Sequence, residues 1–168
     1  IQPVRYEKGS RPVLERAAAG ATVGCRTGRE KALALMRFCR DLYKQSRSWR
    51  PGGAGGARLR AHRYGGTEEQ LLAKGEHLCE CLGRLIVALG EVSGLPGRIL
   101  MHVIAGHIAA ELLTEEGWGY IDPRLGVYYL KPDGRLASAW DLWRRPALMR
   151  DQPDGVKQDV VSYDTWAR

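Results

Sequence analysis

The sequence lacks paired CxxC motifs, a long apolar run and a concentrated block of positive charge. Its four cysteines have neither metal-site nor small-scaffold spacing, so we expect reduced thiols and a cytoplasmic protein, although a first residue that is not Met leaves a removed signal peptide open. The longest nearly uncharged apolar stretch, Ile99 to Ala110, is well short of the roughly 20 residues that a bilayer requires. These absences argue against a disulfide scaffold and a membrane span.

The net charge of +7 and the pI near 9.5 would suit an acidic partner. The basic residues are scattered, however, and no run of them alternates with aromatic residues. Solubility is the simpler explanation of the charge. On this pattern, nucleic-acid binding through Arg58, Arg60 and Arg63 ranks last among the possible functions.

What is present is enough apolar sequence for one core. With 168 residues, 44% of them hydrophobic, we expect a single domain over 1–168, with a core over about 25–130 and a closing helix and tail over 131–168. Residues 1–24 show no clear period and are predicted to be irregular, with a short strand around Arg11 to Leu14. The Gly-rich stretch Arg50 to Gly66 predicts a long loop, either a lid over a site or a disordered segment.

Two capping boxes mark helix starts, Thr27 with Glu30 and Thr67 with Gln70. Apolar periodicity predicts helices over 29–45, over a short stretch that ends at Gly75, and over 78–93. After Pro96 the pattern changes to short β-rich runs. The predicted strands are Arg98 to Ile104, His107 to Leu113, Trp118 to Ile121 and Val127 to Leu130.

Helices followed by a β-meander indicate an α+β fold. The segment Ala137 to Leu148 resembles a closing helix. Residues 151–168 are predicted to be a polar tail with a weak strand over 160–162.

The stretch GHIAAELLTEEGWGYIDP places a histidine on an apolar strand and an aspartate at the end of the next strand. If the two residue numbers of each antiparallel pair sum to 229, His107 lies directly opposite Asp122 and Glu111 opposite Trp118. Opposed side chains lie close enough for a carboxylate to orient an imidazole and stabilise its cation. The alternative, which these two residues alone support equally well, is a buried polar pair with a structural role and no catalytic one.

Cys79 supplies a nucleophile for such a pair. It lies in the first turn of the 78–93 helix, where unpaired N–H groups favour a thiolate, and it shares the apolar stripe that faces the sheet. Cys81 is rotated by roughly 200° and should point away. A metal held by His77, Cys79 and Cys81 is a poor alternative, because alternate residues diverge on a helix and a fourth ligand is not sensibly spaced.

These residues carry a resemblance to the transglutaminase-like superfamily of cysteine enzymes, which use Cys, His and Asp in that chain order. The segment KGEHLCECLGRLIVALGEVSGLPGR resembles the family's Gly before a helical Cys, its helix and its G-I-P-A-R turn. His107, Glu111, Trp118, Asp122 and Pro123 follow the family's H-A-W-V-E, Trp and D-P steps. The sequence departs from this pattern at Glu80, Gly97 and Ala109, which puts the family's substrate preferences in doubt. The continuation DPRLGVYYLKPDGRLASAWDL looks most like small bacterial members.

The resemblance implies a papain-like, transglutaminase-like core with a Cys79, His107 and Asp122 triad, and no cofactor or metal. It further implies acyl transfer through a thioester on a peptide or protein amide, with water or an amine as the acceptor. Gln45 and Trp49 are candidates for an oxyanion donor, and His102 for a residue that supports the triad. A binding or scaffolding module on the same fold is the alternative function.

Overall fold

A computed structural model describes residues 6–46, 66–74, 78–102 and 106–152, and the fold is α+β, as expected. Its helices are α1 (Pro12–Ala21), α2 (Gly28–Ser46), α4 (Glu68–Lys74), α5 (Cys79–Val92) and α6 (Ala139–Arg144), followed by the 3-10 helix η1 (Pro146–Met149). Its strands are β1 (Gly97–His102), β2 (His107–Thr114), β3 (Gly117–Asp122) and β4 (Val127–Tyr128). Among the described residues, no helix is both long and apolar enough to cross a membrane.

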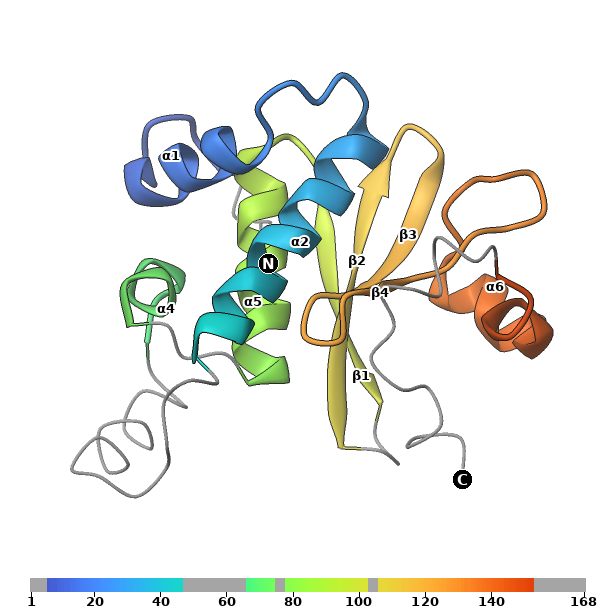
Figure 1. Cartoon of the computed structure of the whole chain (residues 1–168). Helices are drawn as coiled ribbons and strands as arrows, with labels where there is room; N and C mark the ends of the chain where they lie inside the picture. Colours follow the sequence, from blue (N-terminus) through green and yellow to red (C-terminus); the bar gives the residue numbers. More distant parts are fainter. Residues whose placement is uncertain (1–5, 47–65, 75–77, 103–105, 153–168) are drawn as a thin grey trace, which may run out of the picture.

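The four strands form one antiparallel sheet in chain order, β1-β2-β3-β4, with helices on both faces. Figure 1 shows α1, α2, α4 and α5 on one side of the sheet and α6 on the other. The larger apolar core lies between these four helices and the sheet, and includes Leu35, Leu82, Leu85, Leu112 and Ile121. A smaller core under α6 includes Ala109, Tyr120, Tyr129 and Leu142. Helix α5 lies centrally, in contact with α1, α2, α4, β1 and β2.

The N-terminal segment is helical, so the expected short strand at Arg11 to Leu14 is wrong. Pro12 occupies the first turn of α1, where its missing N–H costs nothing. Glu15 accepts hydrogen bonds from the N–H groups of Gly9 and Arg11, and so satisfies backbone donors at the start of α1. Leu14 and Ala18, four residues apart, are the two buried positions of the helix. A stripe this narrow in an alanine-rich segment has too weak a period to be detected from the sequence.

Both predicted capping boxes are present. The Glu30 N–H donates to Thr27 Oγ1 at 3.1 Å and the Thr27 N–H donates to Glu30 Oε2 at 3.1 Å. Thr67 and Gln70 make the same reciprocal pair at 3.1 and 3.3 Å. The closing helix is also confirmed as α6 followed by η1, and its start carries a third box, Ser138 with Asp141, which the sequence analysis missed.

The hairpin between β2 and β3 is centred one residue further along the chain than the predicted pairing, which shifts the strand register by two residues. Thr114 pairs with Gly117, so only Glu115 and Glu116 form the loop, and Glu111 lies opposite Tyr120 rather than Trp118. The Thr114 hydroxyl holds this turn by donating to the Gly117 carbonyl and accepting from the Glu116 N–H. A shift of two residues keeps every side chain on its predicted face. His107 and Asp122 therefore share a face, but as diagonal neighbours rather than opposed ones.

The remaining strands lie close to the predicted ranges. β1 and β2 begin and end within two residues of the prediction over the described positions, whereas β4 has only two residues and is followed by an isolated bridge between Leu130 and Leu136. The predicted loop Arg50 to Gly66, except Gly66 itself, and the predicted strand over 160–162 lie outside the described residues.

Candidate active site

Cys79 is the first residue of α5, after Leu78 as an extended N-cap, and its side chain is partly exposed. Helix α5 packs against β2, and the backbone N–H of Ile108 in β2 donates a hydrogen bond to the Cys79 thiol. Gly83, one helical turn further on, permits this close packing. A Cβ atom at that position would lie 2.8 Å from Cγ2 of Ile108. The glycine therefore helps to place the thiol at the start of β2.

His107, the first residue of β2, lies beside the thiol and binds Asp122 at the end of β3. Its Nε2 is 2.5 Å from Asp122 Oδ2, and both side chains are buried, with 10% and 1% of their surface exposed. The ring is also hydrogen-bonded to Cys79. Because Nε2 faces the carboxylate, Nδ1 is the ring nitrogen left for the thiol. The diagonal placement of His107 and Asp122 brings imidazole and carboxylate together as effectively as direct opposition.

The other carboxylate oxygen of Asp122 organises the turn that follows β3. Oδ1 accepts hydrogen bonds from the N–H groups of Arg124 and Leu125, each at 3.0 Å, and the Asp122 carbonyl accepts from Gly126. Gly126 has a φ of +70°, which favours glycine. One aspartate thus fixes both the histidine and the β3–β4 turn.

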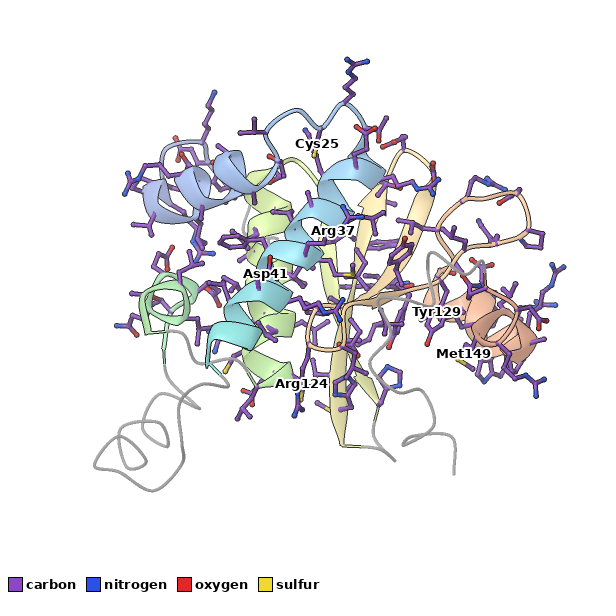
Figure 2. All side chains as sticks on the ribbon, viewed as in Figure 1. Cys25, Arg37, Asp41, Arg124, Tyr129 and Met149 are labelled. Carbon is purple, nitrogen blue, oxygen red and sulfur yellow. The ribbon has the colours of Figure 1, made fainter. Side chains whose placement is uncertain are left out.

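The electrostatics of the site favour an ion pair between thiolate and imidazolium. Burial raises the pKa of the Cys79 thiol, but the Ile108 N–H, His107 and Arg124 together outweigh burial and hold that pKa below its ordinary value. The hydrogen bond to Asp122 raises the pKa of His107, against the opposing effect of burial. Figure 2 shows Arg124 at the end of the sheet opposite to Cys25. The lowered pKa of Cys79 increases the fraction of thiolate, and the raised pKa of His107 increases the fraction of imidazolium.

His102 and Tyr120 extend the site across the sheet. His102 is the register partner of His107, and their ring centroids are 6.1 Å apart. The Tyr120 hydroxyl is 3.3 Å from His102 Nε2. Burial and the charge of His107 lower the pKa of His102, which favours the neutral form of this ring beside His107. Tyr120 was not identified from the sequence, because only the observed register places it next to these histidines.

Glu111 links β2 to β1 and to the start of α6, although it is remote from the Cys79 thiol. Its buried carboxylate accepts hydrogen bonds from Arg98 Nε at 2.6 Å and from the Ala139 N–H at the start of α6 at 2.7 Å. The Arg98 guanidinium also lies over the Trp118 ring, 4.3 Å from its centroid. Arg98 thus links Trp118 to Glu111, which is a structural role for the tryptophan.

The other candidate residues are either buried elsewhere in the packing or outside the described part of the chain. Cys81 is 2% exposed, so it is buried in the packing around α5, which is covered on several sides. The described residues contain no cluster of three or more His, Cys, Asp or Glu side chains that could hold a metal ion. His77, Trp49 and the side chain of Gln45 lie outside the described residues, as do Arg58, Arg60, His62 and Arg63.

The arrangement brings together a thiol with a lowered pKa, an imidazole with a raised pKa and a carboxylate that orients the imidazole. Such a series can generate a thiolate and move one proton to and from a leaving group. Comparison of the chain with protein-family models, with curated proteins and with solved structures finds no match. Functional inference therefore has to start from the geometry of the site.

Proposed function

We propose that this protein is a cysteine-dependent acyl-transfer enzyme that acts on a peptide or protein amide through a thioester at Cys79. The observation that carries the proposal is the continuous hydrogen-bonded series from the Cys79 thiol through His107 to Asp122. The resemblance to the transglutaminase-like superfamily supports it, because that family uses the same three residue types in the same chain order on a helix followed by two strands.

In the first step Sγ of Cys79 attacks the amide carbonyl carbon, and the thiol proton resides on His107. The tetrahedral intermediate collapses when the C–N bond breaks and His107 returns the proton to the departing nitrogen, which leaves an acyl thioester. Asp122 stays ionised and keeps the imidazole oriented throughout. The first N–H groups of a helix have no partner within the helix, so the Cys79 N–H is placed to bind the oxyanion.

In the second step an acceptor attacks the thioester carbonyl while His107 takes its proton, and the Cys79 thiolate leaves. Water gives a free carboxylate, and an amine gives a new amide. Hydrolysis is the simpler of the two reactions, because the sequence contains no recognisable site for an amine. The acceptor does not change what is required of the three residues.

The experiment is to incubate the full chain with a pool of peptide amides, with and without hydroxylamine, and to measure released amine and hydroxamate by mass spectrometry. We expect product from the wild type, at least a thousandfold less from Cys79→Ala, and wild-type amounts from Cys25→Ala. Cys25 is a suitable control because it is also a partly exposed thiol but lies at the opposite end of the sheet from Arg124, whose N–H binds Asp122 (Figure 2). Equal activity in wild type and Cys79→Ala would overturn the proposal, and a wild type that binds peptides without turnover would favour the scaffolding alternative.

A further inference from the structure

A second surface of the molecule combines exposed tryptophans with cations. We call it the α6 surface and define it by Lys131, Trp140, Trp143, Arg144 and Arg145. Trp140 and Trp143 are 58% and 71% exposed, although large apolar side chains are normally covered. Their rings stack with centroids 4.9 Å apart, and the Arg144 guanidinium lies 5.8 Å from the Trp140 centroid.

The α6 surface borders a hollow of about 590 Å³, which Lys131, Arg135, Trp140, Arg144 and Arg145 help to line. Part of its wall is a hydrogen-bonded turn, in which the Gly134 N–H donates to the Lys131 carbonyl and the Lys131 N–H donates to the Arg135 carbonyl. Helix α6 itself is fixed by its capping box and by the bond from Ala139 to Glu111. The hollow is thus built from backbone that is already ordered, which reduces the entropic cost of binding.

The charge of the hollow is not balanced from within the described part of the chain. The lining of the hollow carries the four cations Lys131, Arg135, Arg144 and Arg145 but only two carboxylates, of which Asp133 pairs with Arg135 at 2.6 Å and Asp141 accepts the Ser138 N–H and hydroxyl. Within the described residues, Lys131, Arg144 and Arg145 have no carboxylate within salt-bridge distance. A ligand with several negative charges would supply the missing partners.

The α6 surface also lies on the same face of the sheet as the catalytic histidine. Glu111, which binds the start of α6, is four residues from His107 along β2, a distance of roughly 13 Å in an extended strand. A polypeptide of four to eight extended residues could span the distance between the thiol and α6.

We propose that the α6 surface binds an acidic segment of the peptide or protein substrate, a few residues away from the amide that Cys79 attacks. This rests on the proposed function. Arginine forks match carboxylates in bidentate geometry, and Trp and Arg are the residues that contribute most at protein interfaces. The acidic segment would place its carboxylates on Arg144 and Arg145 and its aliphatic stems against the indoles.

Two other anionic partners fit the observations less well. A membrane would require apolar side chains to insert, but the other exposed large apolar residues of the described chain, Val13, Val23, Ile99 and Met101, lie on other elements. A single-stranded nucleic acid needs aromatic rings spaced for successive bases, whereas Trp140 and Trp143 stack on each other. Both partners become outcomes of the test.

The test measures binding without turnover, in the full chain carrying Cys79→Ser. The probe is fluorescein-labelled octaglutamate, and binding is followed by fluorescence anisotropy at 20 and 150 mM salt. We expect Trp140→Ala and Arg145→Glu each to weaken binding at least tenfold, and added salt to weaken it in the parent. Arg16→Glu, on exposed α1, makes the same charge change away from the hollow and should alter binding less than twofold.

Octaglutamate that does not bind, or that loses as much affinity in Arg16→Glu as in Arg145→Glu, would overturn the inference. Tighter binding of oligothymidylate or of phosphatidylglycerol vesicles through Trp140 and Arg145 would also overturn it, in favour of that partner. Because this readout needs no chemistry, its failure is distinct from failure of the triad, which is tested separately by turnover in the protein with Cys79 intact.

Discussion

Arg98 and Glu111 are directly opposed on β1 and β2, and they form an ion pair in which the carboxylate is fully buried while the guanidinium is half exposed. The two side chains are buried to different extents, so each should respond differently when the other is removed by mutation. Arg98 can be hydrated when it loses Glu111, but Glu111 cannot be hydrated when it loses Arg98.

Arg98→Ala should therefore lower the free energy of unfolding by about 3 kcal/mol, because it leaves a buried carboxylate whose remaining donor among the described residues is the Ala139 N–H. Urea denaturation measures this effect. Arg16→Ala, at an exposed site, serves as the control and should change stability by less than about 0.5 kcal/mol. An Arg98→Ala variant as stable as Arg16→Ala would show that the pair contributes little.

Gly83→Ala should destabilise the protein by about 1 to 3 kcal/mol, even though alanine favours helices by roughly 1 kcal/mol, because the added methyl group would meet Ile108. It should also slow alkylation of Cys79, since α5 would move away from β2. Gly20→Ala in α1 meets no atom within 4 Å and should stabilise the protein by about 0.5 to 1 kcal/mol. If both variants were stabilised, the close packing at Gly83 would not be essential.

Asp122→Asn separates the two roles of the aspartate. The amide oxygen can still accept from the N–H groups of Arg124 and Leu125, so the turn should persist, with a loss of about 1 kcal/mol. The carboxylate that raises the pKa of His107 is gone, so this pKa should fall towards its ordinary value. Titration of the His107 ring by NMR measures the change. An unaltered His107 pKa would mean that Asp122 does not control the imidazole.

The raised pKa of His107 also predicts how stability depends on pH. Protonated His107 is favoured in the folded state, so its contribution is fully present below the unfolded pKa of about 6.5 and is lost as pH rises through the raised native pKa. In a Cys79→Ala background, the stability difference between His107 and His107→Gln should be larger at pH 6 than at pH 9. Urea titrations at both pH values test this, and a difference that grows with pH would contradict it.

Interactions between residues close together in the sequence made much of this fold predictable. Features that depend on contacts between distant residues were not predicted. Thr27 with Glu30 and Thr67 with Gln70 determine their helix starts through side chains only three residues apart, so these starts could be predicted. Helix α1 was missed because only Leu14 and Ala18 of it are buried, a pattern that tertiary packing defines rather than composition.

The sequence predicted that Cys79, His107 and Asp122 would lie together, but it did not predict the strand register that brings them together. The Thr114 hydroxyl holds the two-residue turn at Glu115 and Glu116, and the predicted pairing was centred between Thr114 and Glu115, one residue too early, which shifted the register by two residues. Because a shift of two residues leaves side chains on the same face of the sheet, His107 and Asp122 still meet. The predicted register did not, however, place Tyr120 near the histidines, and it paired Glu111 with Trp118 instead of Tyr120. The bond from Glu111 to the start of α6 joins residues 28 positions apart, which strand periodicity does not encode.

The most direct test of the central claim is the pH dependence of alkylation at each cysteine, followed by mass spectrometry in the wild type and in His107→Ala. We predict that Cys79 reacts with a midpoint below the ordinary thiol value of about 8.5, and that His107→Ala shifts this midpoint upward. Cys39 should stay unreactive in the folded protein, because burial raises its pKa. A Cys79 profile that matches that of Cys25, or that is unchanged by His107→Ala, would contradict the assignment of Cys79 and His107 as a catalytic pair.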